Sequence, residues 1–393
     1  MNTRLGAPRD PSHLRESNKS LVRNVFRRDG PLTRTDVARI SGLTKPTVSA
    51  IVRELLADGT IVESDQVRPA ASGARPTVYE YNSFSRLFAG VHIGVNTTDV
   101  MIADGLGARI AVETFPTPHQ AAHTALERAR EVLRGLLTSR RLHHDRLAAV
   151  GVCVPGMVDT DTGRCLLAPN LGWRGIDVAA YFRELTPAVV VHNVIHAALE
   201  AEHLEGAAVG VGDAVLLFED NGVGAALMAR GSIYSGAYGL AGELGHCKLR
   251  GATEVCACGG VGCLETQVSA QAVLRRAGGL LPAGTEPAGV FAALAASDRP
   301  GATELLRTIG RELGEAAAWV VNITNPRLLL LGGTFAAGGE ELAAGVWETF
   351  GTAALPELRH QLELRRSTLP VAGAVRGALL LARRRADESE QVA

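Results

Sequence analysis

The chain has 393 residues, of which 46% are hydrophobic and 21% charged, a composition typical of a globular protein with two or three domains. No apolar run approaches the roughly 20 residues needed to span a bilayer, and the polar first fifteen residues lack the apolar core of a secretion signal. These features exclude a membrane protein and a small disulfide-bonded scaffold. We expect a cytoplasmic protein.

The formal net charge of −1 argues at first against a nucleic-acid partner, but the charge is unevenly distributed. Residues 1–85 carry 13 Lys and Arg against 9 Asp and Glu, or +4, which leaves −5 for the other 308 residues. A small basic unit therefore precedes a larger acidic one. The basic unit can meet phosphate even though the whole chain is near neutral.

The basic unit has the spacing of three short helices. Residues 18–26 form a helical pattern whose apolar face comprises Leu21, Val22, Val25 and Phe26. Thr33 followed by Asp36 resembles a capping box and predicts the start of a second helix. Thr44 predicts the cap of a third helix.

The third helix is expected to bury a stripe at helical spacing that comprises Val48, Ile51, Val52 and Leu55. Two helices joined by a short Gly-containing turn form a helix-turn-helix, in which the third helix of the unit reads base edges. The candidate DNA contacts in the helices are short polar or cationic side chains, namely Arg34, Lys45, Thr47, Ser49 and Arg53.

A β-hairpin wing is predicted after the third helix, because strand-like segments at residues 61–62 and 77–81 flank a polar stretch rich in Gly and Pro. Arg68 and Arg75, near the tip, are expected to reach a minor groove or the flanking phosphates. The alternative is a helical trimer that mediates only protein contacts. Agreement among caps, turn length, basic face and wing favours a winged helix-turn-helix at residues 16–83 that binds a double-stranded DNA operator.

Residues 86–393 alternate strand-like runs, such as LFAGVHIGV and LLLLGG, with helical runs, such as TELLRTIGRELGEAAAWVVN. This alternation predicts an α/β fold. Several glycines follow the strands, where a turn lets the backbone approach a ligand closely. The last twelve residues, ARRRADESEQVA, are expected to be a solvated run of charges.

One imidazole and three thiolates, from His246, Cys256, Cys258 and Cys263, have a spacing that suits tetrahedral Zn²⁺. Because protein would fill all four positions, no position is left for a catalytic water, and the zinc is expected to be structural. The alternative is that the close cysteines are small buried hydrophobes or a redox pair. The third cysteine and the upstream histidine favour zinc.

The same segment resembles the signature of the ROK family (repressors, open reading frames and sugar kinases). That signature runs Glu-x-Gly-His and then Cys-x-Cys-Gly-x-x-Gly-Cys-x-Glu, and the chain matches it from Glu243 to Glu265 without a departure. Residues 147–173 are similar to the Pro-Gly and Pro-Asn-Leu-x-Trp segments of the family. Residues 18–83 look like the winged helix of its regulators.

The resemblance implies an actin-like (ribonuclease H-like) two-lobed fold of the sugar-kinase type that follows the winged helix-turn-helix of residues 16–83 (the DNA reader). It implies a smaller lobe of residues 86–192 plus 375–393, and a larger lobe of residues 193–374 that carries the zinc loop. It also implies that the zinc loop brings together side chains that contact sugar hydroxyls, namely Asn170, Asn193, Glu243, His246 and Glu265.

The kinases of the family use the Asp of an Asn-Asp pair as general base, but here Asn193 is followed by Val194, which cannot accept a proton. Their first phosphate motif, Asp-x-Gly-Gly-Thr, reads His-Ile-Gly-Val-Asn at residues 92–96. Their second phosphate motif survives only in part, at residues 221–224. We therefore expect a protein that is not an enzyme.

The valine also weakens glucose-like recognition, because the family Asp accepts hydrogen bonds from sugar hydroxyls. Three roles for the large module stay open: it binds a different sugar or sugar phosphate, it binds the usual sugar weakly, or it serves only for dimerisation. We predict a sugar-responsive DNA-binding repressor of carbohydrate metabolism that forms a homodimer or homotetramer. The alternatives are an ATP-dependent sugar kinase and a regulator that needs no effector.

Overall fold

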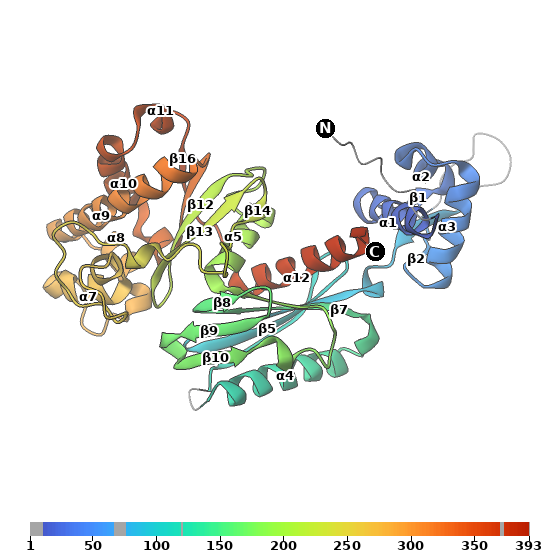
Figure 1. Cartoon of the computed structure of the whole chain (residues 1–393), viewed down its shortest axis with the longest axis horizontal. Helices are drawn as coiled ribbons and strands as arrows, with labels where there is room; N and C mark the ends of the chain where they lie inside the picture. The colour runs from blue at the N-terminus through green and yellow to red at the C-terminus, as the bar shows by residue number, and fades with distance from the viewer. Residues whose placement is uncertain (1–10, 67–75, 119–120, 370–372, 393) are drawn as a thin grey trace, which may run out of the picture.

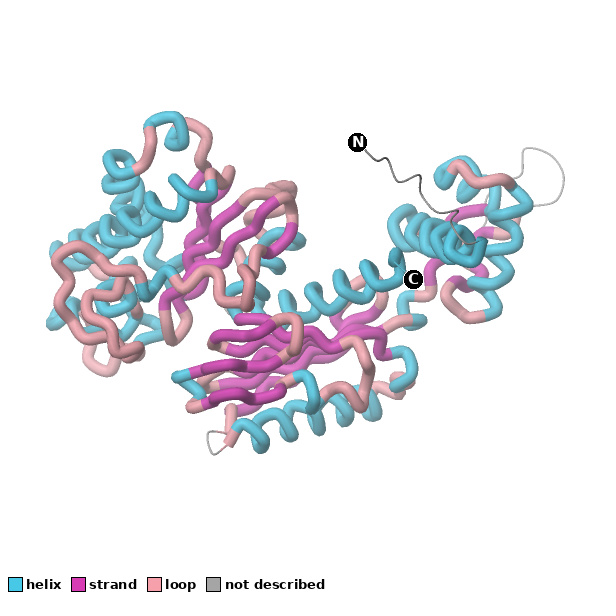
Figure 2. The backbone as a smooth tube through the Cα atoms, in the orientation of Figure 1, coloured by secondary structure: helices cyan, strands magenta, loops and turns pink. Residues whose placement is uncertain are grey.

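The computed structural model describes residues 11–66, 76–118, 121–369 and 373–392. A small N-terminal domain and two larger lobes lie in a row, and the long helix α12 (Gly373–Val392) extends along the middle lobe toward the N-terminal domain (Figure 1). Each lobe contains one five-stranded sheet (Figure 2). No helix in the described ranges combines the length and hydropathy needed to cross a bilayer.

The N-terminal domain is a winged helix-turn-helix. Its helices are α1 (Pro11–Asp29), α2 (Arg34–Ser41) and α3 (Lys45–Ala57), and its strands are β1 (Leu32–Thr33), β2 (Ile61–Glu63) and β3 (Val78–Tyr81). The strands form an antiparallel sheet in the order β1-β3-β2, in which β2 and β3 are the wing hairpin. Thr33 and Asp36 form the expected capping box, and the Thr44 side chain accepts a hydrogen bond from the Thr47 amide.

The hydrophobic core of this domain is close to the prediction. The stripe of α3 is buried, and so are Val22, Val25 and Phe26 of α1. Leu21 was expected on the same inner face, but this expectation is wrong, because its side chain is 41% exposed. It lies instead on the side of α1 that faces the middle lobe.

The middle lobe is built on a sheet in the order β11-β7-β4-β5-β6. These strands are β4 (Leu87–Ile93), β5 (Thr97–Asp104), β6 (Arg109–Pro116), β7 (Leu147–Val154) and β11 (Val189–Asn193). Helix α4 (Ala122–Ser139) packs on one face and α12 on the other. A small sheet adjoins it, formed by β8 (Met157–Asp159), β9 (Arg164–Ala168) and β10 (Trp173–Asp177).

Helix α5 (Val194–Glu205) leads into the second lobe, whose sheet has the order β14-β13-β12-β15-β16. These strands are β12 (Ala214–Glu219), β13 (Val223–Ala229), β14 (Ser232–Ile233), β15 (Leu328–Gly333) and β16 (Glu363–Arg366). Its helices are α6 (Glu265–Val268), α7 (Ala270–Ala277), α8 (Val290–Ala295), α9 (Pro300–Thr324), α10 (Gly339–Ala353) and α11 (Pro356–Arg359). The two lobes together form the actin-like fold of sugar kinases.

Three glycines let α12 approach its neighbours closely. A Cβ atom on Gly151 of β7 would lie 1.8 Å from the Ala378 carbonyl oxygen, and one on Gly90 of β4 would lie 2.2 Å from the Val375 carbonyl oxygen. A Cβ atom on Gly377 would lie 1.7 Å from the Ala197 carbonyl oxygen of α5. Helix α12 is therefore embedded, backbone against backbone, in both the sheet and α5.

The end of α12 is not the solvated charge run that its sequence suggested. Ala386 is buried, and the Asp387 carboxylate accepts hydrogen bonds from Arg27 of α1 at 2.8 Å and from Arg86 at 3.3 Å. A charged side chain of this segment therefore forms ion pairs with residues that are far away in the sequence. Asp387 thus joins the N-terminal domain, the connecting segment and the middle lobe.

Replacing Gly377 by Ala is expected to destabilise the protein by about 1–3 kcal/mol, because the added methyl group has no space against the α5 backbone. Thermal and urea unfolding of the purified variant measure this change. Gly135→Ala is the matched control, because Gly135 is an exposed position of helix α4 with no heavy atom within 4 Å of an added Cβ. That change is expected to be neutral or stabilising, and equal effects of the two changes would contradict the close crossing.

Candidate functional site

A cavity of about 540 Å³ lies between the two lobes. The middle lobe contributes residues 155–157 and the loop before β10, and the second lobe contributes β13 and residues 239–246. All of the predicted sugar contacts line this one cavity: Asn170, Asn193, Glu243, His246 and Glu265. Residues separated by almost a hundred positions in the sequence therefore face a common space.

Two asparagines connect elements around the cavity. Asn193 caps α5, since its Oδ1 accepts a hydrogen bond from the Ile195 amide at 2.7 Å, while its Nδ2 donates to the Gly156 carbonyl at 2.7 Å. Asn170 donates from Nδ2 to the Asn221 carbonyl oxygen at 2.8 Å. This second bond joins the middle lobe directly to the second lobe.

Two acidic side chains of the cavity, Glu243 and Glu265, lie between β14 and the start of α6. Glu265 Oε2 accepts a hydrogen bond from the Val223 amide at 2.9 Å, which fixes the carboxylate against β13. Glu243 Oε2 lies 3.8 Å from Nε2 of His246. Burial raises the pKa of Glu243, and nearby Glu265 raises it further, whereas His246 lowers it.

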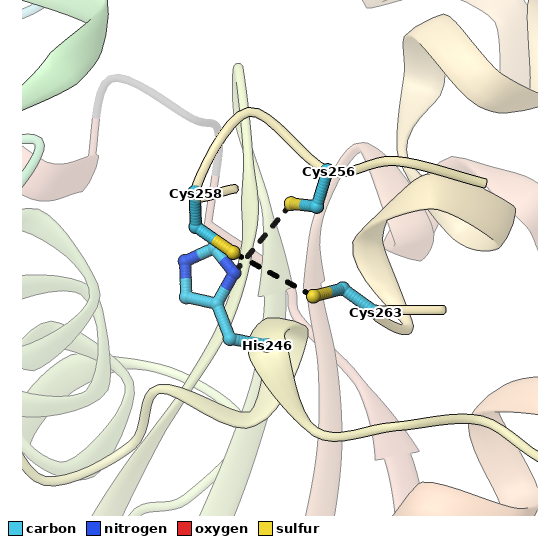
Figure 3. A group of neighbouring side chains, drawn as sticks. All are labelled: His246, Cys256, Cys258 and Cys263. Carbon is cyan, nitrogen blue, oxygen red and sulfur yellow. Dashed lines mark hydrogen bonds between the residues drawn. The ribbon is translucent and has the colours of Figure 1, made fainter. Parts of the chain in front are cut away.

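A cluster of one imidazole and three thiols adjoins the cavity (Figure 3). The ligand atoms of His246, Cys256, Cys258 and Cys263 all lie within 4.8 Å of one another. The Cys258 and Cys263 sulfur atoms are 3.7 Å apart, and Cys256 Sγ lies 3.8 Å from Nδ1 of His246. These cysteines form no disulfide.

Lys248 adds a positive charge beside this cluster. Its Nζ donates a hydrogen bond to Cys263 Sγ at 3.1 Å, and the Gly260 amide donates to Cys258 Sγ at 3.4 Å. Hydrogen bonds and positive charge both stabilise thiolate rather than thiol. Cys258 and Cys263 thus have neighbours that favour a negatively charged sulfur, whereas burial raises the pKa of the Cys256 thiol.

A second cavity, of about 310 Å³, lies next to the first one. Asn96, residues 219–222 and Thr334 are among the residues that line it, so both segments compared with the phosphate motifs of the kinases contribute to this cavity. Three of the lining side chains carry carboxyl groups, namely Glu219, Asp220 and Glu265. Burial raises the pKa of Glu219 to about 7, and it also raises the pKa of Asp220.

The predicted DNA contacts lie on the helix-turn-helix. Lys45 and Arg53 of α3 are exposed, while Thr47 and Ser49 are partly buried on the same helix. Arg34, at the start of α2, stacks over the Tyr79 ring of the wing strand β3, with its guanidinium carbon 5.2 Å from the ring centroid. Arg68 and Arg75 lie outside the described residues.

Some cavity residues escaped the sequence analysis. Arg174 of β10 and Asp220 at the end of β12 both line the cavity between the lobes. The only sequence signal for Asp220 is its position between a strand and a Gly-containing loop. Arg174 follows the Trp of the Pro-Asn-Leu-x-Trp segment, and a strand pattern alone does not reveal which of its side chains face a second lobe.

Comparison with known proteins defines the class. Residues 88–385 match the ROK family, and residues 24–62 match a winged helix-turn-helix DNA-binding domain. The chain belongs to the ROK family. It is a DNA-binding transcriptional regulator of that family, with its winged helix-turn-helix placed before the two-lobed module.

Its relatives include regulators of similar length. The chain is 28% identical over 385 residues to the DNA-binding transcriptional dual regulator NagC of Escherichia coli K12, covering 94% of this chain and 93% of that protein. It is 24% identical to the xylose repressor of Caldicellulosiruptor bescii, covering 94% of this chain and 96% of that protein. The match to both relatives extends over the reader and the module together.

Solved structures of ROK family proteins are also similar to this chain. A ROK family transcriptional regulator described as a homologue of the E. coli MLC protein superposes with a TM-score of 0.80 and 25% identity, over 97% of this chain and 98% of the other. A ROK family glucokinase from Streptomyces griseus, solved with glucose and AMPPNP, superposes with a TM-score of 0.64 and 25% identity, over 76% of this chain and 99% of the other.

Proposed function

We propose that this regulator is a repressor of carbohydrate metabolism genes that releases its DNA operator when a small sugar or sugar phosphate enters the cavity between the lobes. The observation that carries the proposal is the convergence of five predicted sugar contacts on one cavity in a chain that also has a DNA reader. The relatives named for N-acetylglucosamine and xylose support a sugar as effector. We assign the reader to residues 16–83, the smaller lobe to residues 86–192 plus 375–393, and the larger lobe to residues 193–374.

The cavity suits a polar ring with several hydroxyl groups. The Asn170 and Asn193 amides and the Glu243 and Glu265 carboxylates offer donors and acceptors, while the walls include apolar backbone and side-chain atoms of Leu167 and residues 223–225. Few placed polar groups among apolar walls are typical of small-molecule sites. The basic side chains among the residues that line the cavity are those of Arg174 and His246.

We propose that kinase activity is lost. Val194, at the first position of α5, lines the cavity where the kinases of the family carry their general base. The neighbouring His192 and His196 are poor substitutes, because burial lowers the pKa of His192 to about 3 and also lowers the pKa of His196. The second cavity is lined by three carboxyl groups, those of Glu219, Asp220 and Glu265, beside the guanidinium of Arg275. In their ionised form these carboxylates would repel the phosphates of a nucleotide.

We propose that His246, Cys256, Cys258 and Cys263 hold a structural Zn²⁺ ion. A tetrahedron with Zn–S bonds of about 2.3 Å has S···S edges of roughly 3.8 Å, and the Cys258–Cys263 distance of 3.7 Å fits that edge. Four protein ligands leave no position for a substrate, so the ion would hold the loop that presents His246 and Glu265 to the cavity. Glu243, beside the other ring nitrogen of His246, would orient the imidazole.

For the metal, Cys258→Ser is expected to lower the zinc content well below one ion per chain and to lower the melting temperature, because one thiolate ligand is lost. Metal analysis of the dialysed protein and thermal unfolding measure the two effects. Cys247→Ser is the control, because Cys247 lies outside the ligand set although it is next to His246. A fully metallated and equally stable Cys258→Ser variant would rule out the proposed ligands.

For the DNA reader, Arg53→Ala is expected to weaken binding to every DNA fragment and to reduce the slope of log K against log salt by about one. The reason is that an exposed guanidinium on α3 is placed to neutralise one phosphate. Gel retardation at several salt concentrations measures the slope. Arg109→Ala, which removes an exposed charge from strand β6 of the middle lobe, is expected to leave the slope unchanged.

Sugar response requires the effector to bind the DNA-free state more tightly than the DNA-bound state. A retardation assay with the full chain and genomic fragments, titrated with N-acetylglucosamine, xylose, glucose and their phosphates, is expected to show release with at least one of them. Glu243→Gln should weaken that response by about tenfold or more, the cost of one lost charged hydrogen bond. Its DNA affinity without sugar should stay unchanged.

Glu286→Gln, a change at an exposed position away from the cavity, is the control for this experiment. No effect of any sugar on DNA binding would contradict an effector role and leave a regulator that needs no effector. An ATP-coupled assay over the same sugars separates the kinase alternative. Turnover above background would overturn the assignment that rests on Val194.

We propose a homodimer or homotetramer, because winged helices read paired half-sites. Large apolar side chains on the second lobe support a contact between copies: Trp319 and Ile323 of α9 are 36% and 83% exposed, and Trp347 of α10 is 37% exposed. Exposed apolar groups gathered on neighbouring helices are typical of an interface. Sedimentation velocity of the full chain measures the oligomeric state, and a monomer at micromolar concentration would contradict this proposal.

A further inference from the structure

A third cavity, of about 550 Å³, lies at the junction between the DNA reader and the middle lobe. It is bounded by α1, the end of α2, the turn between β5 and β6, and α12. Three arginines line it, Arg27, Arg28 and Arg383, and no acidic residue of the described ranges is among its lining residues. A cavity with this lining attracts anions.

The three lining arginines differ in how far carboxylates compensate their charge. Asp387 is shared, because Arg27 reaches it at 2.8 Å and Arg86 at 3.3 Å. Arg28 is paired with its neighbour Asp29 on the exposed surface. Among the lining arginines, Arg27 and Arg28 therefore each have an ion-pair partner.

Arg383 is the least compensated of the three cations. Its Nη1 donates to the Leu106 carbonyl oxygen at 3.2 Å, and no carboxylate of the described residues lies within 4.0 Å of its guanidinium nitrogens. The neighbouring Arg376, by contrast, is paired with Glu205 at 2.8 Å. Burial lowers the pKa of Arg383 and the charges of Arg27 and Arg376 lower it further, whereas Asp387 and Tyr81 raise it. A charge in that position costs free energy unless an anion accompanies it.

The helix dipole does not explain the arrangement. Arg27 and Arg28 lie in the last turn of α1, where a positive charge is favourable in any helix. Arg383 lies in the middle of α12, where no helix end offers such compensation. It is held against the turn at Gly107, where an added Cβ would lie 2.7 Å from its Nη1.

We propose that the junction cavity binds the phosphate group of a small phosphorylated metabolite. Guanidinium groups pair with phosphate oxygens through two parallel hydrogen bonds, and three of them match a group that carries two negative charges. Leu21 and Leu106, which are 41% and 48% exposed at this cavity, provide apolar surface for the carbon skeleton. This site is separate from the cavity between the lobes and does not depend on its ligand.

The position of the site gives the ligand a regulatory role. A phosphate held by α1 and α12 together ties the DNA reader to the middle lobe, so it stabilises the one orientation of the reader in which the cavity exists. It therefore shifts the protein toward that orientation. The effect on DNA binding follows from whether this orientation fits the spacing of two half-sites.

Titration of the full-length protein with inorganic phosphate, at constant ionic strength set with chloride, tests the proposal by calorimetry and by the shift in melting temperature. Phosphate is expected to bind and to raise the melting temperature. Arg383→Gln should weaken this binding by at least about tenfold, the loss of one charge-assisted contact. Arg385→Gln, which removes an exposed charge two residues away on α12, should leave it unchanged.

Equal phosphate affinity of the wild type and Arg383→Gln would overturn the proposal, as would equal stabilisation by phosphate and chloride. Arg28→Gln provides a second variant on a different helix if Arg383→Gln does not fold. A retardation assay at several salt concentrations separates a DNA contact from a metabolite site. If Arg383→Gln reduces the salt slope of DNA binding but not the affinity for phosphate, the cavity faces the DNA backbone and the proposal is wrong.

Discussion

The architecture depends on the close approach of α12 to two strands and to α5. Gly90 and Gly151 leave no room for a side chain beneath the helix, and Gly377 leaves none where it crosses α5. Contacts of backbone against backbone are stiff, because no flexible side chain can absorb a displacement. The helix therefore moves with the sheet and α5 as one body. Its C-terminal turn carries Asp387 to α1, so the same body also holds the DNA reader.

In this arrangement, two helices, α5 and α12, connect the cavity between the lobes to the DNA reader. Asn193 fixes the start of α5 at the cavity, α5 crosses α12, and α12 ends at the reader. The bond from Asn170 to the Asn221 carbonyl crosses between the lobes and must break when they separate. A ligand that changes the separation of the lobes acts on elements that are packed directly against α12. Such a contiguous set of packed elements is a physical route for coupling, provided that it has two discrete arrangements.

The winged helix-turn-helix was predictable because its signals are local. The capping box of Thr33 and Asp36 and the stripe of α3 each depend on residues within one or two helical turns. The Cys and His residues were also predictable as a cluster, since a fixed spacing within one loop places their side chains together. The contact between α12 and the DNA reader was not predictable, because Arg27 and Arg86, the partners of Asp387, lie 360 and 301 positions away. Charge at a chain end has no pattern that distinguishes a solvated tail from an interdomain ion pair.

Glu219 gives a physical reason for the proposed loss of nucleotide binding at the second cavity. Its carboxylate accepts hydrogen bonds from the Ala270 amide, at 2.9 Å, and from the Thr334 hydroxyl. Ala270 is the first residue of α7, and the start of a helix is a position that favours an anion such as phosphate. The protein thus places its own carboxyl group at this helix end and links it to the segment after β15. A nucleotide phosphate would have to displace an internal carboxyl group that holds two elements together.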